Sequence, residues 1–220
     1  MSIQTSKLTV KDLEQFSAII FDFDGVIAES VEIKTEAFRE MYISYGKEIS
    51  EGVVNHHLAN GGMSRFKKFP FYHDRFLDQK LSQKEIQYLS DQFSDIVINK
   101  VISCPLVNGA LSLLDLLHSK KVLFISTGTP DKEIKKIINK RKLRRYFREV
   151  FGSPSSKQDH IKNILKNYKL KKSETLYIGD AETDLKAAKN TEIHFILRKH
   201  KLNLGLVRKF KGKVIDDLSL

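Results

Sequence analysis

Short apolar runs, each followed at once by small and polar residues, constrain the fold of this chain more than any other feature. The three clearest runs are residues 18–21, 122–125 and 176–178. After each run comes a turn and then apolar residues at helical spacing, as at Ile134, Ile137 and Ile138. Such runs predict buried strands, and strands that alternate with helices predict a parallel sheet with helices on both faces. Further candidate strands are residues 149–151, 193–197 and 213–215.

The alternation stops between residues 31 and 104, where the sequence predicts helices only. Two helical faces there are apolar: that of Phe38, Met41, Tyr42 and Tyr45, and that of Ile86, Leu89, Phe93 and Ile96. Ser82 and Glu85 have the spacing of a capping box at the start of the second helix. Because this block lies between the first and second strands, we predict an α/β core, formed by residues 1–30 and 105–220, with an all-helical domain inserted at 31–104.

Composition limits the class of protein. With 41% hydrophobic and 30% charged residues in a chain of 220, the sequence has the balance of a globular protein that buries a sizeable core. The single cysteine, Cys104, excludes an intrachain disulfide, and no Cys/His cluster has the spacing of a zinc site. Residues 1–16 lack the apolar stretch of a secretory signal, and no run approaches the ~18 apolar residues of a membrane span. We therefore predict a reduced, cytoplasmic protein without membrane association.

The formal net charge of +11 favours anionic partners, whether phosphates, nucleic acid or acidic lipids. Residues 132–148 and 198–213 carry most of the excess lysine and arginine. In the first stretch, Ile134, Ile137 and Ile138 form an apolar face, which favours a solvated amphipathic helix over a nucleic-acid surface. The two stretches lack the interleaved pattern of basic and aromatic residues that is typical of base stacking. We therefore do not expect nucleic acid as a partner.

Asp22 and Asp24 directly follow the first buried strand and are followed in turn by Gly25. Both carboxylates can reach one point above the sheet edge, and ligands of open α/β sheets bind beyond the carboxyl ends of the strands. A calcium-binding EF-hand loop is excluded, because Ile20 and Val31 would occupy the positions of its first acidic ligand and its bidentate glutamate. Two turn aspartates without function are the remaining alternative.

Ser126, Thr127 and Gly128 end the second strand, and Thr129 and Pro130 are placed as the N-cap and first residue of the next helix. The hydroxyl and the exposed backbone amides of this turn can hold a phosphate oxygen. The same residue types are also common in turns without function.

Lys157 occupies the first turn of a predicted helix, where the helix dipole disfavours a positive charge. Carboxylates and a bound phosphate near its ammonium group would compensate for this placement. In a chain this rich in lysine, a solvated side chain is the alternative.

Asp180 follows the third apolar run, and Asp184 begins the next helix, where it can also serve as the N-cap. Both side chains can face the first aspartate pair. A cluster of carboxylate oxygens suits Mg²⁺, which binds through a few carboxylates and a substrate phosphate. The sequence therefore predicts a magnesium site at this edge of the sheet.

These four groups of residues, in this order and each at a strand end, resemble the motifs of the haloacid dehalogenase superfamily of phosphohydrolases. The resemblance covers essentially the whole chain, and the inserted helices lie where that superfamily has a helical cap. It implies a Rossmann-like core. Within the superfamily, the chain looks most like phosphoglycolate phosphatases and β-phosphoglucomutases.

The resemblance assigns roles to individual residues. Asp22 is similar to the nucleophile, and Asp24 to the general acid and base. Ser126 and Lys157 resemble the residues that bind the phosphoryl group. The positions implied for the substrate site are Gly25, Thr127 and Gly128, and those implied for the metal are Asp22, Asp24, Asp180 and Asp184.

The activity implied by the resemblance is magnesium-dependent hydrolysis of a small phosphomonoester, such as a sugar or carboxylate phosphate, through an aspartyl phosphate on Asp22. Asp24 favours phosphoryl transfer, because the dehalogenases of the superfamily lack a second aspartate there. A phosphomutase would use the same two residues and is one alternative. The other is a non-catalytic module that binds phosphorylated or nucleic-acid partners through its charge. The sequence does not indicate an oligomeric state.

The cap contributes a glycine-containing loop at residues 60–65, which ends in Arg65. Arg65 is a candidate for binding a substrate carboxylate, a second phosphate or sugar hydroxyls, because its planar fork forms paired hydrogen bonds. A surface arginine beside two lysines is the alternative. His56 and His57 are weaker candidates, because adjacent residues point in different directions from a helix and neither histidine has a metal partner at i+4.

Overall fold

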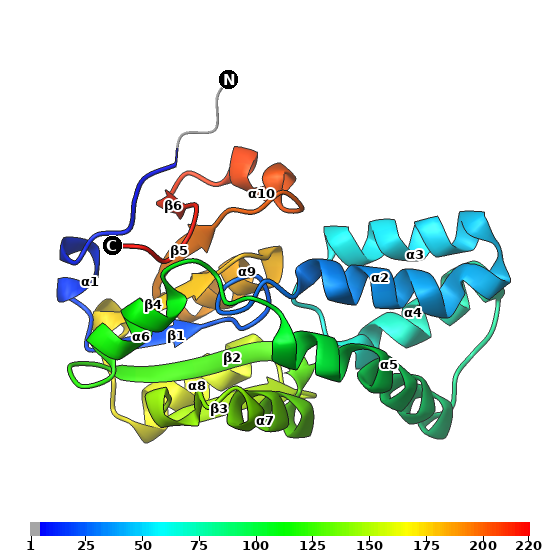
Figure 1. The fold of residues 1–220 in the computed structure, drawn as a ribbon, viewed down its shortest axis with the longest axis horizontal. Coiled ribbons are helices and arrows are strands. Elements are labelled where there is room, and N and C mark those ends of the chain that lie inside the picture. The colour runs from blue at the N-terminus through cyan, green and yellow to red at the C-terminus, as the bar shows by residue number, and fades with distance from the viewer. Residues whose placement is uncertain (1–4) are drawn as a thin grey trace.

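Six strands form one parallel sheet in the computed structural model, which describes residues 5–220. The strands are β1 (Ala18–Phe21), β2 (Val122–Pro130), β3 (Glu149–Ser153), β4 (Thr175–Gly179), β5 (His194–Arg198) and β6 (Val214–Ile215). Their order across the sheet is β3-β2-β1-β4-β5-β6, and all neighbouring pairs are parallel. This is the Rossmann-like arrangement that the sequence predicts (Figure 1). Residues 1–4 of the predicted core lie outside the described residues.

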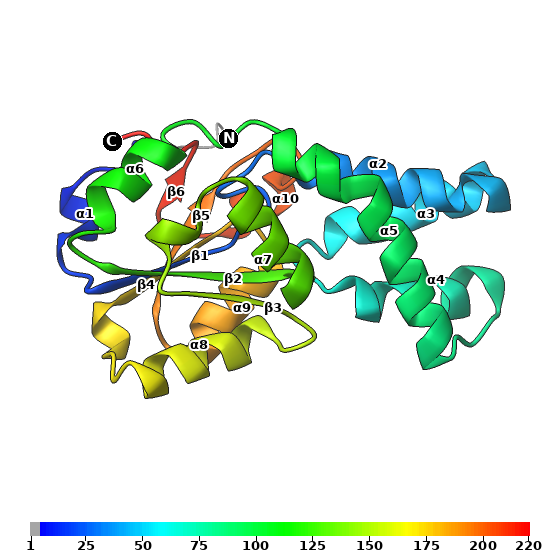
Figure 2. The same ribbon diagram turned by 60° about the horizontal axis from the view of Figure 1, so that its bottom comes forward.

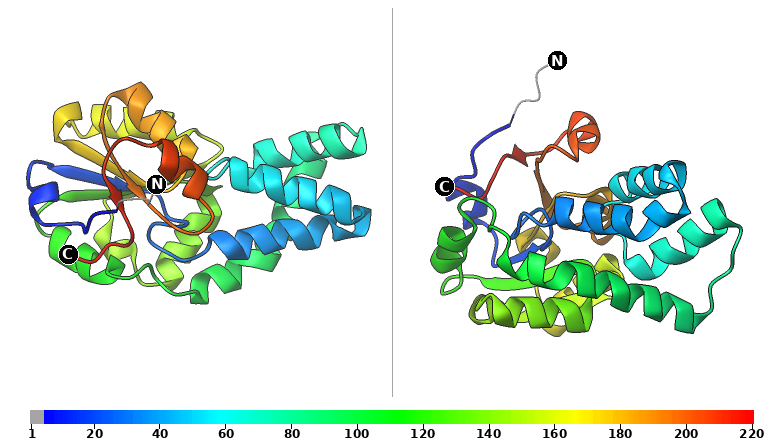
Figure 3. Two further views of the ribbon diagram at one scale, coloured as in Figure 1. Left: turned by 90° about the horizontal axis from the view of Figure 1, so that it is seen from above. Right: turned by 45° about the vertical axis from the view of Figure 1, so that its right-hand side comes forward.

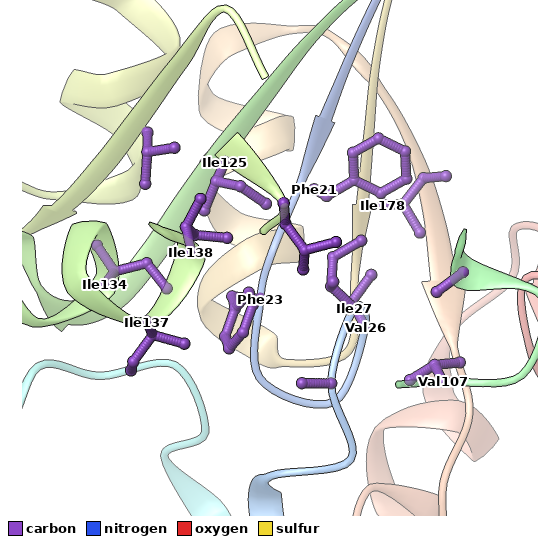
Figure 4. Close-up of a cluster of buried hydrophobic side chains, with 14 of the residues drawn as sticks. Phe21, Phe23, Val26, Ile27, Val107, Ile125, Ile134, Ile137, Ile138 and Ile178 are labelled. Atoms are coloured by element: carbon purple, nitrogen blue, oxygen red, sulfur yellow. The ribbon is translucent and has the colours of Figure 1, made fainter. Parts of the chain in front are cut away.

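Helices cover both faces of the sheet because its strands are buried on both sides. The core helices are α1 (Lys11–Glu14), α6 (Ala110–Leu117), α7 (Asp131–Lys140), α8 (Lys157–Asn167), α9 (Glu182–Thr191) and α10 (Leu204–Lys209), with the short 3-10 helices η2 (Arg144–Tyr146) and η3 (Lys172–Glu174). Ile19 and Phe21 of β1 pack in an apolar cluster with α6 and α7, whereas Ala18 and Ile20 pack with α8 and α9. Successive strand residues point to opposite faces, so such a strand must be apolar throughout. Figure 2 shows α7 and α8 on opposite sides of the sheet, and Figure 4 shows the cluster beneath α7.

The second strand is longer than predicted. Thr129 and Pro130 continue β2, and α7 begins at Asp131, so Thr129 is not the N-cap and Pro130 is not the first helical residue. The physical reason is that the Thr129 hydroxyl bonds to Asp24, 2.9 Å away, instead of to the helix backbone. Pro130 is extended, with ψ at 142°, and pairs with Ser153 of β3.

Between residues 31 and 103 every secondary-structure element is a helix, as predicted. The helices are α2 (Val31–Tyr42), the 3-10 helix η1 (Ile43–Tyr45), α3 (Lys47–Ala59), α4 (Arg65–Leu77) and α5 (Gln83–Ser103). Ser82 and Glu85 form the expected capping box at the start of α5. Tyr45 does not share the buried face of α2: it lies in η1 and is 46% exposed, because the helix tightens after Tyr42.

The inserted helices project from the end of the core that lies opposite the C-terminus (Figures 1 and 3). We propose that they form a cap domain with the predicted boundaries, residues 31–104. Within residues 5–220, no helix combines the length and the apolar character that crossing a membrane requires.

Candidate active site

A cavity of about 70 Å³ lies between the core and the inserted helices, beyond the carboxyl ends of β1, β2 and β4. The order of the strands reverses between β1 and β4, which is where doubly wound sheets bind their ligands. The core lines the cavity with Asp22, Asp24, Thr127, Gly128, Thr129 and Asp180. The inserted helices line it with Val31, Lys34, Phe38, His57, Gly61, Gly62, Met63, Arg65, Lys68 and Phe93. Side chains from both parts therefore meet at one place.

Asp22 follows β1 and forms a buried ion pair with Lys157. The Lys157 Nζ lies 2.6 Å from Asp22 Oδ2 and 2.5 Å from Asp184 Oδ1. Lys157 is the first residue of α8, as predicted, and the two carboxylates compensate for its unfavourable position at the helix N-terminus. Burial raises the pKa of Asp22 to about 7, and the negative charges of Asp184 and Asp24 act in the same direction against the attraction of Lys157.

Asp22, Asp180 and Asp184 form a buried acidic cluster in which the ligand oxygens lie within 4.8 Å of one another. Burial raises the pKa of Asp180 and of Asp184, which means that ionising these carboxyl groups without a bound cation is costly. When all three carboxylates are ionised, Lys157 alone does not balance their charge. A set of oxygen donors with excess negative charge fits Mg²⁺. His200 contacts Asp180 with its Nε2 at 2.8 Å, and the Tyr177 hydroxyl donates to Asp184 at 2.6 Å.

Asp184 is the third residue of α9 and not its N-cap, which is Ala181. Its Oδ2 accepts hydrogen bonds from the backbone N–H groups of Ala181, at 3.0 Å, and of Asp180, at 3.3 Å. The side chain thus satisfies backbone donors at the start of the helix while its other oxygen contacts Lys157. These bonds fix the carboxylate within the acidic cluster.

The Asp24 carboxylate is not part of the acidic cluster, and its predicted role as a metal ligand stays a prediction. Its carboxylate accepts hydrogen bonds from Ser30 at 2.6 Å, from Thr129 at 2.9 Å and from the Lys34 ammonium at 2.5 Å. Burial acts to raise the pKa of Asp24, but Lys34 and the two hydroxyls more than offset this and hold the pKa below its usual value. The two predicted catalytic aspartates therefore have different environments, one beside Lys157 and one beside Lys34.

Ser126 and Thr127 point in different directions at the end of β2. The Ser126 hydroxyl is buried at 2.9 Å from His160 Nδ1 of α8, and Ser126 does not line the cavity. Thr127 and Gly128 do line it. Because successive strand residues alternate in direction, the two side chains point to opposite sides of the strand. Thr127 therefore lines the cavity together with Asp22, and Ser126 does not.

The loop before α4 approaches the core where Gly62 and Gly128 meet. A Cβ atom on Gly128 would lie 2.4 Å from the Gly62 carbonyl oxygen. A Cβ atom on Gly62, whose φ is +70°, would lie 2.2 Å from Thr183 Oγ1 and 2.7 Å from Lys157 Nζ. The Thr183 hydroxyl also donates to the Gly61 carbonyl oxygen at 2.9 Å. The predicted loop therefore reaches Lys157 and the end of β2, and Gly62 permits the close approach.

Gly25 adopts a φ of +75°, and a Cβ atom there would lie 2.5 Å from Asp180 Oδ2. The turn after β1 can therefore pass close to the acidic cluster only with glycine at this position.

Arg65 lines the cavity, but its planar fork binds Glu133 of α7. The Arg65 Nη1 and Nη2 atoms lie 3.0 and 2.8 Å from the two carboxylate oxygens, and both side chains are buried. Arg65 Nη1 also donates to Ser94 at 2.8 Å, and the guanidinium group lies 4.3 Å from the centre of the Phe93 ring. Arg65 thus connects the inserted helices to the core. Its paired N–H donors bind Glu133 and are not directed at the cavity as free donors.

The sequence analysis did not identify Lys34 and Lys68 as cavity-lining residues, and it did not predict that His57 is buried beside them. Lys34 is ten residues beyond Asp24 in the sequence, and no motif distinguishes it from the other lysines. Lys68 lies on the helical row of Arg65 and Phe69, which are also buried, so its position on that face was the available signal. His57 shares the buried face of α3 with Val53 and Val54.

Comparison with known proteins agrees with this geometry. Residues 19–198 match the family model described as haloacid dehalogenase-like hydrolase. The chain is 23% identical over 209 residues to a phosphoglycolate phosphatase of Pseudomonas fluorescens, which covers 91% of this chain and 76% of the relative. It is 25% identical over 201 residues to a phosphorylated carbohydrates phosphatase of Thermotoga maritima, with 86% of this chain and 88% of the relative covered. The solved structure of a β-phosphoglucomutase from Clostridium difficile matches with a TM-score of 0.73 at 19% identity, over 93% of this chain and 92% of that chain.

Proposed function

Because this chain belongs to the haloacid dehalogenase-like hydrolases, we propose that it is a magnesium-dependent phosphatase that hydrolyses a small phosphomonoester through an aspartyl phosphate on Asp22. The observation that carries the proposal is the position of Asp22 just after β1, where it is buried, contacts Lys157 and belongs to the acidic cluster. Relatives named as phosphatases of phosphoglycolate and of phosphorylated carbohydrates support a small phosphorylated substrate.

In the first step, a carboxylate oxygen of Asp22 attacks phosphorus, and the bond from phosphorus to the leaving oxygen breaks. Asp24 gives its proton to the leaving alkoxide. Because the Lys34 ammonium favours an ionised Asp24, Asp24 takes up this proton from solvent as the substrate binds, and in later turnovers it carries the proton gained from water in the second step. Lys157, Thr127 and the backbone amides after β2 bind the phosphoryl oxygens.

In the second step, Asp24 takes a proton from water as the water oxygen attacks the phosphorus of the aspartyl phosphate. The bond between phosphorus and Asp22 breaks, inorganic phosphate leaves, Asp22 is again a carboxylate, and Asp24 again carries the proton that it gave up in the first step. The contacts of Asp24 with Ser30, Thr129 and Lys34 stabilise its ionised form, which is the form that accepts this proton.

Asp22, Asp180 and Asp184 would hold Mg²⁺, since their oxygens converge and their negative charge exceeds that of the single lysine among them. When bound, Mg²⁺ supplies positive charge that screens the phosphoryl oxygens from the attacking carboxylate. His200 and Tyr177 orient two of these carboxylates from outside the cluster.

A mutase would return the phosphoryl group to a second hydroxyl of the substrate. The likeness to a β-phosphoglucomutase structure, at 19% identity, concerns the fold alone, whereas the relatives found by sequence are named phosphatases. A non-catalytic binding module is disfavoured, because Asp22, Asp24 and Lys157 are all present and are brought together.

Phosphate release from sugar phosphates, phosphoglycolate, nucleotides and p-nitrophenyl phosphate tests the proposal. We expect free phosphate with Mg²⁺ and none with a chelator. A phosphorylated isomer instead of free phosphate would establish the mutase. No reaction with any of these compounds would contradict phosphoryl transfer.

A further inference from the structure

Lys68 of α4 is a buried lysine for which no acidic partner exists among residues 5–220. Its side chain is 2% exposed, and no carboxylate lies within salt-bridge distance. Its Nζ lies 2.9 Å from His57 Nδ1 and 3.5 Å from the His57 carbonyl oxygen, and 5.5 Å from the centre of the Phe38 ring. Buried charges are normally paired, so this ammonium group requires an explanation.

The other cations around the cavity are each paired. Lys34 contacts Asp24, Lys157 contacts Asp22 and Asp184, and Arg65 contacts Glu133. The positive charges of Lys34, Lys157 and Arg65 all act to lower the pKa of Lys68, after the larger effect of its burial, and together they bring that pKa to about 7. A negative charge beside Lys68 would stabilise its protonated form. Because Lys68 lines the cavity, an anionic group of a ligand can reach it from there.

His57 supports an anion at the same place. Burial and the nearby lysines lower the pKa of His57 well below its usual value, so the imidazole is neutral. A protonated Lys68 must donate to Nδ1, and the imidazole proton then lies on Nε2, where it is a second donor. Lys68 and His57 come from α4 and α3, and both line the cavity with Asp22 and Asp24.

We propose that Lys68 and His57 bind a second anionic group of the substrate, on its leaving-group side. The substrate class is then a short phosphomonoester that carries a carboxylate or a second phosphate, and not a neutral sugar phosphate. This inference rests on the proposed phosphatase activity. Because the cavity measures about 70 Å³, only a small group separates the anion from the scissile phosphate while the inserted helices contact the core.

The test compares two substrates of equal length, phosphoglycolate and 2-hydroxyethyl phosphate, which differ in the presence of the carboxylate. In the native enzyme kcat/KM should be higher for phosphoglycolate. Lys68→Met should lower kcat/KM for phosphoglycolate roughly 10- to 100-fold, as expected for the loss of a hydrogen bond to a charged group, and should change that for 2-hydroxyethyl phosphate much less. Lys68→Gln, which keeps a donor but no charge, should show a smaller loss than Lys68→Met, because a neutral donor retains part of the hydrogen bond.

Lys67→Met is the matched control, because Lys67 is the exposed neighbour of Lys68 and carries the same charge. It should leave the ratio of the two kcat/KM values unchanged. Ethanediol bisphosphate distinguishes the two anions: a preference for it over phosphoglycolate that disappears in Lys68→Met would identify a second phosphate.

Equal kcat/KM values for the matched pair, or a ratio that Lys68→Met leaves unchanged, would overturn the inference while the phosphatase activity stands. Failure of the native enzyme to hydrolyse any phosphomonoester, including p-nitrophenyl phosphate, would instead remove the proposed function and this inference with it. The two failures are therefore distinguishable.

Discussion

Replacement of Lys68 by methionine should stabilise the ligand-free protein. Methionine has a similar length and fills the same apolar surroundings without a charge. The pKa of Lys68 falls from 10.5 to about 7 on folding, and at 1.36 kcal/mol per pH unit this corresponds to a cost of at most about 5 kcal/mol at neutral pH. The variant also leaves His57 Nδ1 without its donor, which costs about 1–3 kcal/mol. The net expectation is a stabilisation of about 2 kcal/mol.

The pH dependence of this effect has a defined sign. Between pH 7 and 10.5 the unfolded chain binds a proton at Lys68 that the folded chain does not, so Lys68 destabilises the native protein less as the pH rises. The groups that act on Lys68 are His57, Lys34, Lys157, Arg65 and Asp24. The difference in stability should therefore change by about 3 kcal/mol between pH 7 and pH 9.5, so that the variant, more stable by about 2 kcal/mol at pH 7, is less stable by about 1 kcal/mol at pH 9.5.

Urea denaturation followed by circular dichroism, at several pH values, measures the difference in unfolding free energy between the native protein and Lys68→Met. In thermal denaturation at pH 7, the melting temperature of the variant should be about 4–8 °C higher than that of the native protein. Lys67→Met, at an exposed position, should change it little. A variant that is less stable at pH 7, or a difference that does not vary with pH, would refute the assignment of Lys68 as a strained, unpaired charge.

Three further variants test other parts of the account. Arg65→Met should destabilise the protein by about 3–5 kcal/mol in urea denaturation, because it leaves a buried carboxylate unpaired, and a loss below 1 kcal/mol would contradict the tie between insertion and core. Gly62→Ala should lower kcat at least ~10-fold, whereas Gly205→Ala, where a Cβ atom meets nothing within 4 Å, should not; equal activities would show that the loop need not approach the core. Thr127→Val should reduce kcat/KM at least ~10-fold more than Ser126→Ala, and the reverse order would return the phosphate contact to Ser126.

The sheet, the insertion and the acidic positions follow from the sequence because each depends on local pattern. Apolar runs such as that of β1 have no other placement than a doubly buried strand, and a carboxylate that follows one lies at the ligand-binding edge. The placement of Asp22, Asp180 and Asp184 in one cluster needs only the parallel order of β1 and β4.

The partners of charged side chains could not be predicted in the same way. Glu133 is 68 residues from Arg65, and only the packing of the inserted helices against α7, chiefly through α5, brings the two together. Lys68 is one of several lysines in its segment, and its burial depends on which helical face meets the core. The residue type of Thr129 predicts an N-cap. In the structure its hydroxyl contacts Asp24 instead, and β2 continues through Thr129.

The most direct test of the central claim is phosphate release by Asp22→Asn with saturating Mg²⁺. Asparagine keeps the shape of the side chain and lacks the nucleophilic oxygen, and Asp91→Asn, at an exposed position of α5, is the matched control. The account predicts that Asp22→Asn loses at least ~10⁴-fold in kcat while Asp91→Asn keeps native activity. Turnover by Asp22→Asn within ~10-fold of the native rate would contradict an aspartyl phosphate on Asp22.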